Sequence, residues 1–315
     1  MRLAIVLLLL IPAATAAAQR PDGLDPLYRR IAADLKQGKP LVATVHVALC
    51  DNRVIWCGRL GDGDRPERNL YWGGAAGFSA WFDRSRGWRR IFRDDGDGKQ
   101  VLERVVYRMQ VRRPGARWQR LGVTKPFEVL LVGLAHRGVK IDVATWRFID
   151  EVATERGATL RLADGRTINY GGKGHLVGYA GHNHLMEATL LGDVVWPRVT
   201  RREPLGYFAL ACLTARYYKT HLSRRGGARA LLLTRSLMYP GAFTIDGLLR
   251  GVIAGEEQHQ VYLRGVERYA TVQKRPQRVI RAAFTHDADP RFVRRHGGVP
   301  GRTQAAPGQK DLGEL

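Results

Sequence analysis

The stretches His175-Leu-Val-Gly-Tyr-Ala-Gly-His182 and Gly206-Tyr-Phe-Ala-Leu-Ala-Cys212 are the most informative parts of this sequence. Each is a short apolar run typical of a buried strand, and each ends at a side chain capable of acid–base or nucleophilic chemistry. Parallel strands bring their carboxyl ends to one edge of a sheet, where ligand chemistry gathers. The sequence therefore predicts a cysteine–histidine dyad in which the imidazole of His182 activates the thiol of Cys212.

Further apolar runs and amphipathic stretches surround these two strands and predict an α/β protein. We expect a mostly parallel sheet flanked by helices on both faces of a single domain. The expected strands cover residues 41–49, 101–111, 126–134 and 229–234, with a hairpin over 159–170. The expected helices cover residues 144–156, 213–222, 242–253 and 256–272, and residues 74–91 show near-helical spacing of their aromatic side chains.

The chain divides by composition into four segments. Residues 1–18 contain a charged start, a short apolar core and small residues before Gln19, which is typical of a secretory signal peptide. A segment over 19–39 precedes the expected α/β domain, which covers 40–293. Residues 294–315 lack apolar runs and predict a disordered basic tail.

The order of these motifs resembles the caspase-like fold of clan CD cysteine peptidases, a group that includes legumain, gingipain and clostripain. The run Tyr179-Ala-Gly-His182 resembles the strand that ends in a His-Gly motif in those families, with Asn183 in place of the glycine. Leu210-Ala-Cys212 resembles their Ala-Cys motif, and the run from 230 to 243 resembles the strand and loop that follow. The resemblance spans residues 40–254 in element order.

This resemblance implies a cysteine peptidase that needs no cofactor or metal, and the signal-like start implies that it is exported. The thiolate of Cys212 would attack a peptide carbonyl, and His182 would protonate the leaving amine. Backbone N–H groups near Gly181 and Cys212 would hold the oxyanion, and Asn183 and His184 are further candidates for the pocket. His184 is also a competing base, whereas we expect His175, at the start of its strand, to be a surface residue.

The cysteine content bears on which thiol is free. The chain has Cys50, Cys57 and Cys212, and an odd number in an exported protein leaves one unpaired or bonded to another molecule. Cys50 and Cys57 are close enough in sequence to close a small disulfide loop; the alternative is that all three cysteines are reduced and buried. The stretch from Asn69 to Gly74 could form a substrate wall or a helix-capping turn.

The formal net charge of +22 is compatible with binding to an anionic envelope surface. Arginine is spread along the whole chain, so no specific nucleic-acid partner is expected, and we expect a periplasmic or secreted monomer acting on peptides or proteins. Two other functions stay open: an inactive caspase-like binding or scaffold protein, and a metal-dependent hydrolase built from His182, His184 and Glu187. Activation by self-cleavage would use an exposed loop such as 201–202 or 224–225.

Overall fold

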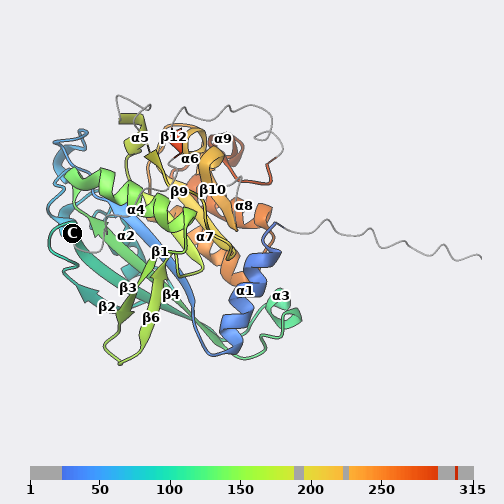
Figure 1. Cartoon of the computed structure of the whole chain (residues 1–315). Coiled ribbons are helices and arrows are strands. Elements are labelled where there is room, and N and C mark those ends of the chain that lie inside the picture. The colour runs from blue at the N-terminus through green and yellow to red at the C-terminus, as the bar shows by residue number, and fades with distance from the viewer. Residues whose placement is uncertain (1–22, 188–194, 223–226, 290–301, 304–315) are drawn as a thin grey trace, which may run out of the picture.

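One eight-stranded sheet forms the centre of the computed structural model, in the order β11-β10-β9-β7-β1-β4-β3-β2 (Figure 1). The structure describes residues 23–187, 195–222, 227–289 and 302–303. The strands of this sheet are β1 (Leu41–Ala48), β2 (Arg89–Asp94), β3 (Val101–Val111), β4 (Phe127–His136), β7 (Leu176–Ala180), β9 (Leu205–Leu210), β10 (Ala228–Thr234) and β11 (Phe284–Thr285). The two small sheets pair β5 (Gly157–Arg161) with β6 (Thr167–Gly171), and β8 (Val195–Trp196) with β12 (Arg302–Thr303).

The five central strands β4, β1, β7, β9 and β10 are parallel to one another. At one edge β3 runs antiparallel to both β4 and β2, and at the other β11 runs antiparallel to β10. The expected mostly parallel sheet in a single α/β domain is therefore confirmed. This strand order is consistent with a caspase-like fold, since β7, β9 and β10 are neighbours in the sheet and keep their chain order, with the short β8 of a separate sheet between β7 and β9.

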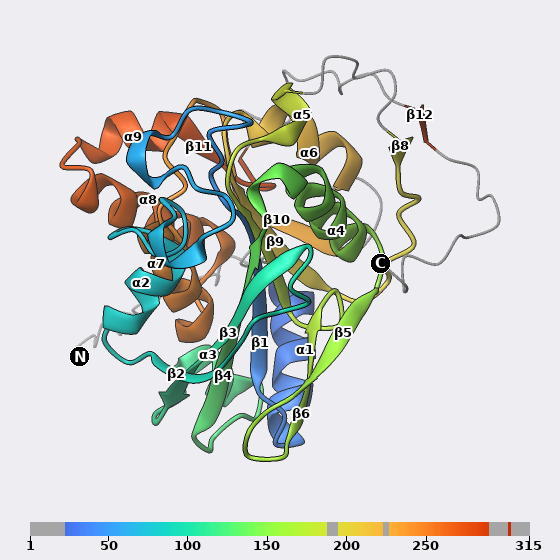
Figure 2. The same cartoon turned by 90° about the vertical axis from the view of Figure 1, so that its left-hand side faces the viewer.

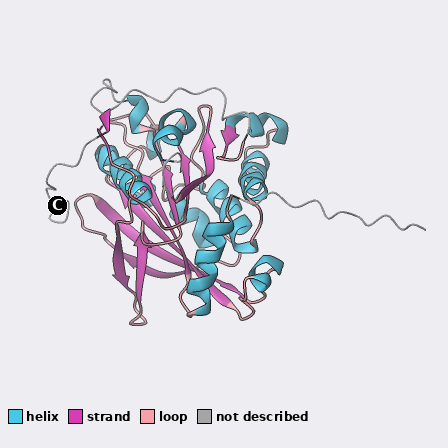
Figure 3. Ribbon diagram, turned by 45° about the vertical axis from the view of Figure 1, so that its right-hand side comes forward, coloured by secondary structure: helices cyan, strands magenta, loops and turns pink. Residues whose placement is uncertain are grey.

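Helices cover both faces of the sheet, as Figures 2 and 3 show. The helices are α1 (Asp25–Lys36), α2 (Phe78–Arg84), α3 (Ala116–Arg120), α4 (Ile141–Ala153), α5 (His184–Glu187), α6 (Thr214–Leu222), α7 (Ala242–Ala254), α8 (Gln258–Val272) and α9 (Gln277–Ala283). Side chains of α1, α2, α7 and α8 share one buried cluster with strand residues, and those of α4 and α6 share a second on the opposite face. A third buried cluster joins side chains of the β5–β6 hairpin to side chains of β1, β3 and β4.

The central strands are continuous apolar runs because both of their faces are covered. All eight residues of β1 are buried, and so are all those of β7 and β9. In the register of the sheet, Ala180 lies opposite Leu210, so β7 and β9 end at the same level. Gly178 allows this close pairing because a Cβ there would lie 2.2 Å from the Phe208 ring.

Three expectations about the chain differ from the structure or fall outside it. Residues 74–91 do not form one helical stretch, since α2 ends at Arg84 and β2 begins at Arg89. The segment over 19–39 contains α1, whose apolar side chains pack into the core. The expected signal peptide lies outside the described residues, as does the expected tail apart from 302–303. Among the described residues, no helix is long and apolar enough to span a membrane.

Candidate functional site

The candidate site lies where three neighbouring parallel strands end. Cys50 follows β1, His182 follows β7 and Cys212 follows β9, each two residues beyond the end of its strand. Because these strands are parallel and level, the three loops meet at the carboxyl edge of the sheet. The side-chain amide of Asn183 donates a hydrogen bond of 2.7 Å to the main-chain carbonyl of Cys212, which joins the two loops of the predicted dyad.

The imidazole of His182 is held by neighbours on one of its two nitrogens. Its Nε2 lies 3.2 Å from the hydroxyl of Tyr71. Burial raises the pKa of Tyr71, so the phenol stays protonated. Burial also lowers the pKa of His182, so the ring is neutral near pH 7. The main chain is fixed as well, because Tyr179 donates a 2.6 Å hydrogen bond to the His182 carbonyl.

A disulfide between Cys50 and Cys57 lies directly beside this ring. The distances from His182 Nε2 to the sulfur atoms of Cys50 and Cys57 are 3.0 and 3.3 Å. The side chain of Asn69 holds Cys50 in place, accepting from its N–H at 3.0 Å and donating to its carbonyl at 2.7 Å. This pairing leaves Cys212 as the free thiol.

Cys212 is partly exposed, and its Sγ lies 3.8 Å from the carbonyl oxygen of Met238. Among the described residues, no hydrogen bond joins its thiol to His182. The next residue, Leu213, has a φ of +54°, a left-handed conformation that is strained for a leucine. Its N–H donates to Ser236 O at 3.2 Å. The turn at Cys212 is therefore fixed by its backbone before α6 begins.

The backbone donors expected near the dyad differ in availability. The N–H of Gly181 donates to Leu210 O at 3.1 Å, so it is engaged within the sheet and is not available to an oxyanion. The N–H of Cys212 has no partner within the described parts of the chain, which makes it a candidate oxyanion donor. Gly181 instead serves the backbone, since its φ of +153° and a Cβ contact of 3.0 Å with Ala48 both favour glycine.

The other candidate residues near His182 are Asn183, His184 and Glu187. The Oδ1 of Asn183 accepts the N–H of Leu185 at 3.2 Å, so this side chain caps α5 while its amide holds Cys212. His184 is the first residue of α5 and is partly exposed. The side chain of Glu187 lies outside what the structure describes. In the described part, the cluster with ligand spacing is Cys50, Cys57 and His182, and it does not include His184.

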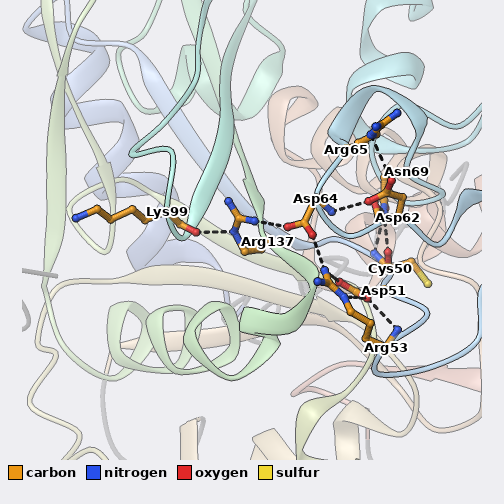
Figure 4. A network of polar contacts seen from close by, with 9 residues as sticks. All are labelled: Cys50, Asp51, Arg53, Asp62, Asp64, Arg65, Asn69, Lys99 and Arg137. Atoms are coloured by element: carbon orange, nitrogen blue, oxygen red, sulfur yellow. Dashed lines mark hydrogen bonds and ion pairs between the residues drawn. The ribbon is translucent and has the colours of Figure 1, made fainter.

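An acid–arginine network supports the loop after β1 (Figure 4). The guanidinium of Arg53 bridges Asp51 and Asp64 at 2.6 and 2.7 Å, and Arg137 pairs with Asp64 from the side of β4. Hydrogen bonds from Arg53 lower the pKa of Asp51, which stays ionised. Because these carboxylates are paired, the network serves to hold the disulfide loop against the sheet.

Beside this loop lies an open hollow of about 770 Å³, lined by residues that include Asp51, Trp56 and Asp62. The Trp56 side chain is 79% exposed, one residue before Cys57. The hollow is formed by the loop that follows β1, and its lining includes neither His182 nor Cys212.

The expectation that His175 is a surface residue is wrong. His175 is buried, its Nδ1 accepts the N–H of Val42 and its Nε2 donates to Asp34, both at 3.1 Å. In the suggested cleavage loop at 201–202, Arg201 is buried and donates to carbonyls at the end of α4 at 2.6 and 2.9 Å, whereas Arg202 is exposed. The alternative at 224–225 lies outside the described residues.

No family model, curated protein or solved structure matches this chain. Tyr71 is the site residue that sequence reasoning did not single out. The one sequence feature that pointed to Tyr71 was the aromatic–glycine stretch from Asn69 to Gly74. The contact between Tyr71 and His182 joins residues more than a hundred positions apart in the sequence. The proximity of Cys50 and Cys57 to His182 was likewise not expected.

Proposed function

We propose that this protein is an exported cysteine peptidase that uses Cys212 as nucleophile and His182 as acid–base residue. The observation that carries the proposal is the Asn183–Cys212 hydrogen bond, which ties the loops after β7 and β9 together at one sheet edge. A free thiol and a neutral imidazole at the ends of adjacent strands form the minimal set for thiol chemistry on a carbonyl.

The reaction follows from the side chains present. The thiol of Cys212 would give its proton to His182, and the resulting thiolate would attack the peptide carbonyl carbon to form a tetrahedral oxyanion facing the Cys212 N–H. As the C–N bond breaks, the leaving amine would take a proton from the imidazolium, which returns to its neutral form. Nδ1 of His182 is the nitrogen suited to this step, since Tyr71 and the disulfide occupy the Nε2 side. Water then hydrolyses the thioester. Cys212 and His182 require no cofactor for these steps.

Substrate binding would use the hollow beside the disulfide loop. The hollow is open and wide enough to admit a peptide side chain, and Trp56 offers an apolar wall at its rim. Asp51 and Asp64 are already paired with Arg53, which favours apolar over cationic substrate side chains. The same proposal includes periplasmic or secreted localisation, a monomeric state and contact with an anionic envelope surface. It is supported by the signal-like start of the sequence and by the net charge of +22.

The test is the rate of iodoacetamide labelling between pH 5 and 9. With Cys50 and Cys57 bonded, Cys212 is the thiol that reacts. We expect labelling at pH 6–7 to be faster than that of a free cysteine. The variant His182→Ala should slow labelling below pH 8, and His184→Ala, a histidine two residues away, is the matched control.

A peptide-library screen with wild type and Cys212→Ser completes the experiment. Cleavage lost in Cys212→Ser and reduced in His182→Ala is the expected result. Slow labelling that is insensitive to His182 would overturn the proposal and favour a caspase-like binding or scaffold protein.

A further inference from the structure

A cluster of two sulfurs and one imidazole nitrogen lies at the edge of the sheet. The Sγ atoms of Cys50 and Cys57 and a ring nitrogen of His182 all lie within 4.8 Å of one another. They come from two loops, those after β1 and β7. While the disulfide is intact, its sulfurs are poor ligands; thiolates and imidazole, by contrast, are the ligands that Zn²⁺ prefers.

We propose that reduction of the Cys50–Cys57 disulfide creates a binding site for Zn²⁺ or a similar thiophilic divalent cation, formed by Cys50, Cys57 and His182. A dithiol reductant supplies two electrons and two protons, so that the disulfide becomes two thiols and the reductant becomes a disulfide. Binding of the cation then releases the two thiol protons to solvent. The imidazole binds in its neutral form through Nε2.

The backbone around the cluster holds the three ligands before any cation binds. Asn69 holds Cys50 on both its N–H and its carbonyl. The N–H of Cys57 donates to the side chain of Asn52 at 2.8 Å, and Tyr179 holds the carbonyl of His182. None of these hydrogen bonds uses a sulfur atom, so reduction of the disulfide does not itself remove a donor or an acceptor from them. A preorganised ligand set loses little conformational freedom on binding.

The surroundings of the cluster suit a cation that is shielded but reachable. Cys50 is buried, whereas Cys57 and His182 are partly exposed, so a path from solvent exists on one side. In a tetrahedral site, three protein ligands leave the fourth position open. The Tyr71 hydroxyl lies beside the cluster, 3.2 Å from His182 Nε2. Three side chains with one open position is the pattern of accessible zinc sites.

Occupation of this site would affect the proposed dyad. A cation on Nε2 ties His182 to the loop after β1 and occupies the lone pair with which the ring would accept a second proton, so the reduced, metal-loaded protein should be inactive as a peptidase. This consequence rests on the proposed function. Cation binding itself does not.

The test is a titration of the purified full chain with Co²⁺, under anaerobic conditions after reduction with a phosphine. Thiolate ligands give Co²⁺ an intense near-ultraviolet charge-transfer band, and a four-coordinate site gives strong visible bands. We expect both to saturate at one Co²⁺ per chain and to disappear when Zn²⁺ is added. The oxidised protein should give neither band.

Variants of the proposed ligand residues test which side chains give rise to the charge-transfer band. Cys57→Ser and His182→Ala should each weaken Co²⁺ binding by roughly 100-fold or more, at least the loss typical of disturbing a metal site. Cys212→Ser and His184→Ala are the matched controls and should bind as wild type does. Cys57→Ala and His182→Gln repeat the measurement should a first variant fail to fold.

Two results would overturn the proposal. One is a reduced, folded wild-type protein without a thiolate band. The other is a band that survives in Cys57→Ser but is lost in Cys212→Ser. Iodoacetamide labelling of the oxidised protein tests the peptidase separately, so failure of one proposal is distinguishable from failure of the other.

Discussion

The side-chain amide of Asn183 donates a 2.7 Å hydrogen bond to the carbonyl oxygen of Cys212, across the gap between two strand ends. The same side chain accepts the N–H of Leu185, so it is buried with both of its polar atoms bonded. Asn183 follows His182 directly. One side chain therefore sets how the loop of the histidine lies against the loop of the cysteine.

Asn183→Ala should destabilise the protein by about 1–3 kcal/mol, because it leaves a buried carbonyl and an N–H without partners. Asn183→Asp should cost more at pH 7, since a carboxylate would face the Cys212 carbonyl. Urea unfolding measures the stability, and iodoacetamide labelling measures the position of the thiol. An Asn183→Ala variant with wild-type stability and labelling rate would show that the bridge contributes nothing.

His175 should make the stability depend on pH. Its Nδ1 accepts the N–H of Val42, so a second ring proton would displace that bond, and burial lowers the pKa of His175 below 6.5. The unfolded chain then binds a proton that the folded chain does not. Stability should be constant above about pH 6.5 and fall as pH drops below it. Burial lowers the pKa of His136 as well, which adds to the fall with the same sign.

Thermal unfolding from pH 5 to 8 tests this dependence, with His175→Leu as the variant. It should be less stable at pH 7, because the Val42 N–H loses its partner, and its stability should vary less with pH. The carboxyl group of Asp34 does not interfere in this range, because the hydrogen bond from His175 lowers its pKa to about 2. A wild-type slope in the variant would assign the dependence to other groups.

Reduction of the Cys50–Cys57 disulfide should lower the free energy of unfolding by about 2–3 kcal/mol, the chain-entropy value for a loop of this length. The double variant Cys50→Ser/Cys57→Ser should lose a similar amount and become insensitive to reductant. Cys212→Ser is the control and should keep the full response. Guanidinium unfolding with and without reductant gives both values; an equal midpoint in the two conditions would contradict the prediction.

Trp56→Ala should reduce peptide cleavage without reducing stability. The side chain is 79% exposed, so its removal should change the unfolding free energy by less than about 0.5 kcal/mol. Loss of one apolar contact with substrate should lower kcat/KM by roughly tenfold or more. Val279→Ala, an exposed apolar residue on α9, is the matched control. Unchanged kcat/KM with Trp56→Ala would place the substrate elsewhere.

The sequence identified the central strands well because their signal is local. Buried parallel strands are continuous apolar runs, and the strands expected at 41–49 and 126–134 correspond to β1 and β4 within two residues. The helix expected at 242–253 corresponds to α7. These patterns were sufficient for the fold class and for the placement of His182 and Cys212 at strand ends.

The expectations that failed depend on partners distant in sequence. Residues 89–94 form β2 because they pair with β3, after a turn at Gly87 with a φ of +92°. His175 is buried by Asp34 of α1, a partner 141 residues away. Tyr71 and the disulfide reach His182 for the same kind of reason, and no local pattern reports such contacts.

The level ends of β7 and β9 have a consequence for protein engineering. Cys50, His182 and Cys212 all lie outside the strands, and the paired residues Ala180 and Leu210 close the framework beneath them. The connecting loops can therefore be exchanged while the strand registers stay as they are. Such grafts would turn this chain into a scaffold on which new reactive groups are presented from a fixed platform.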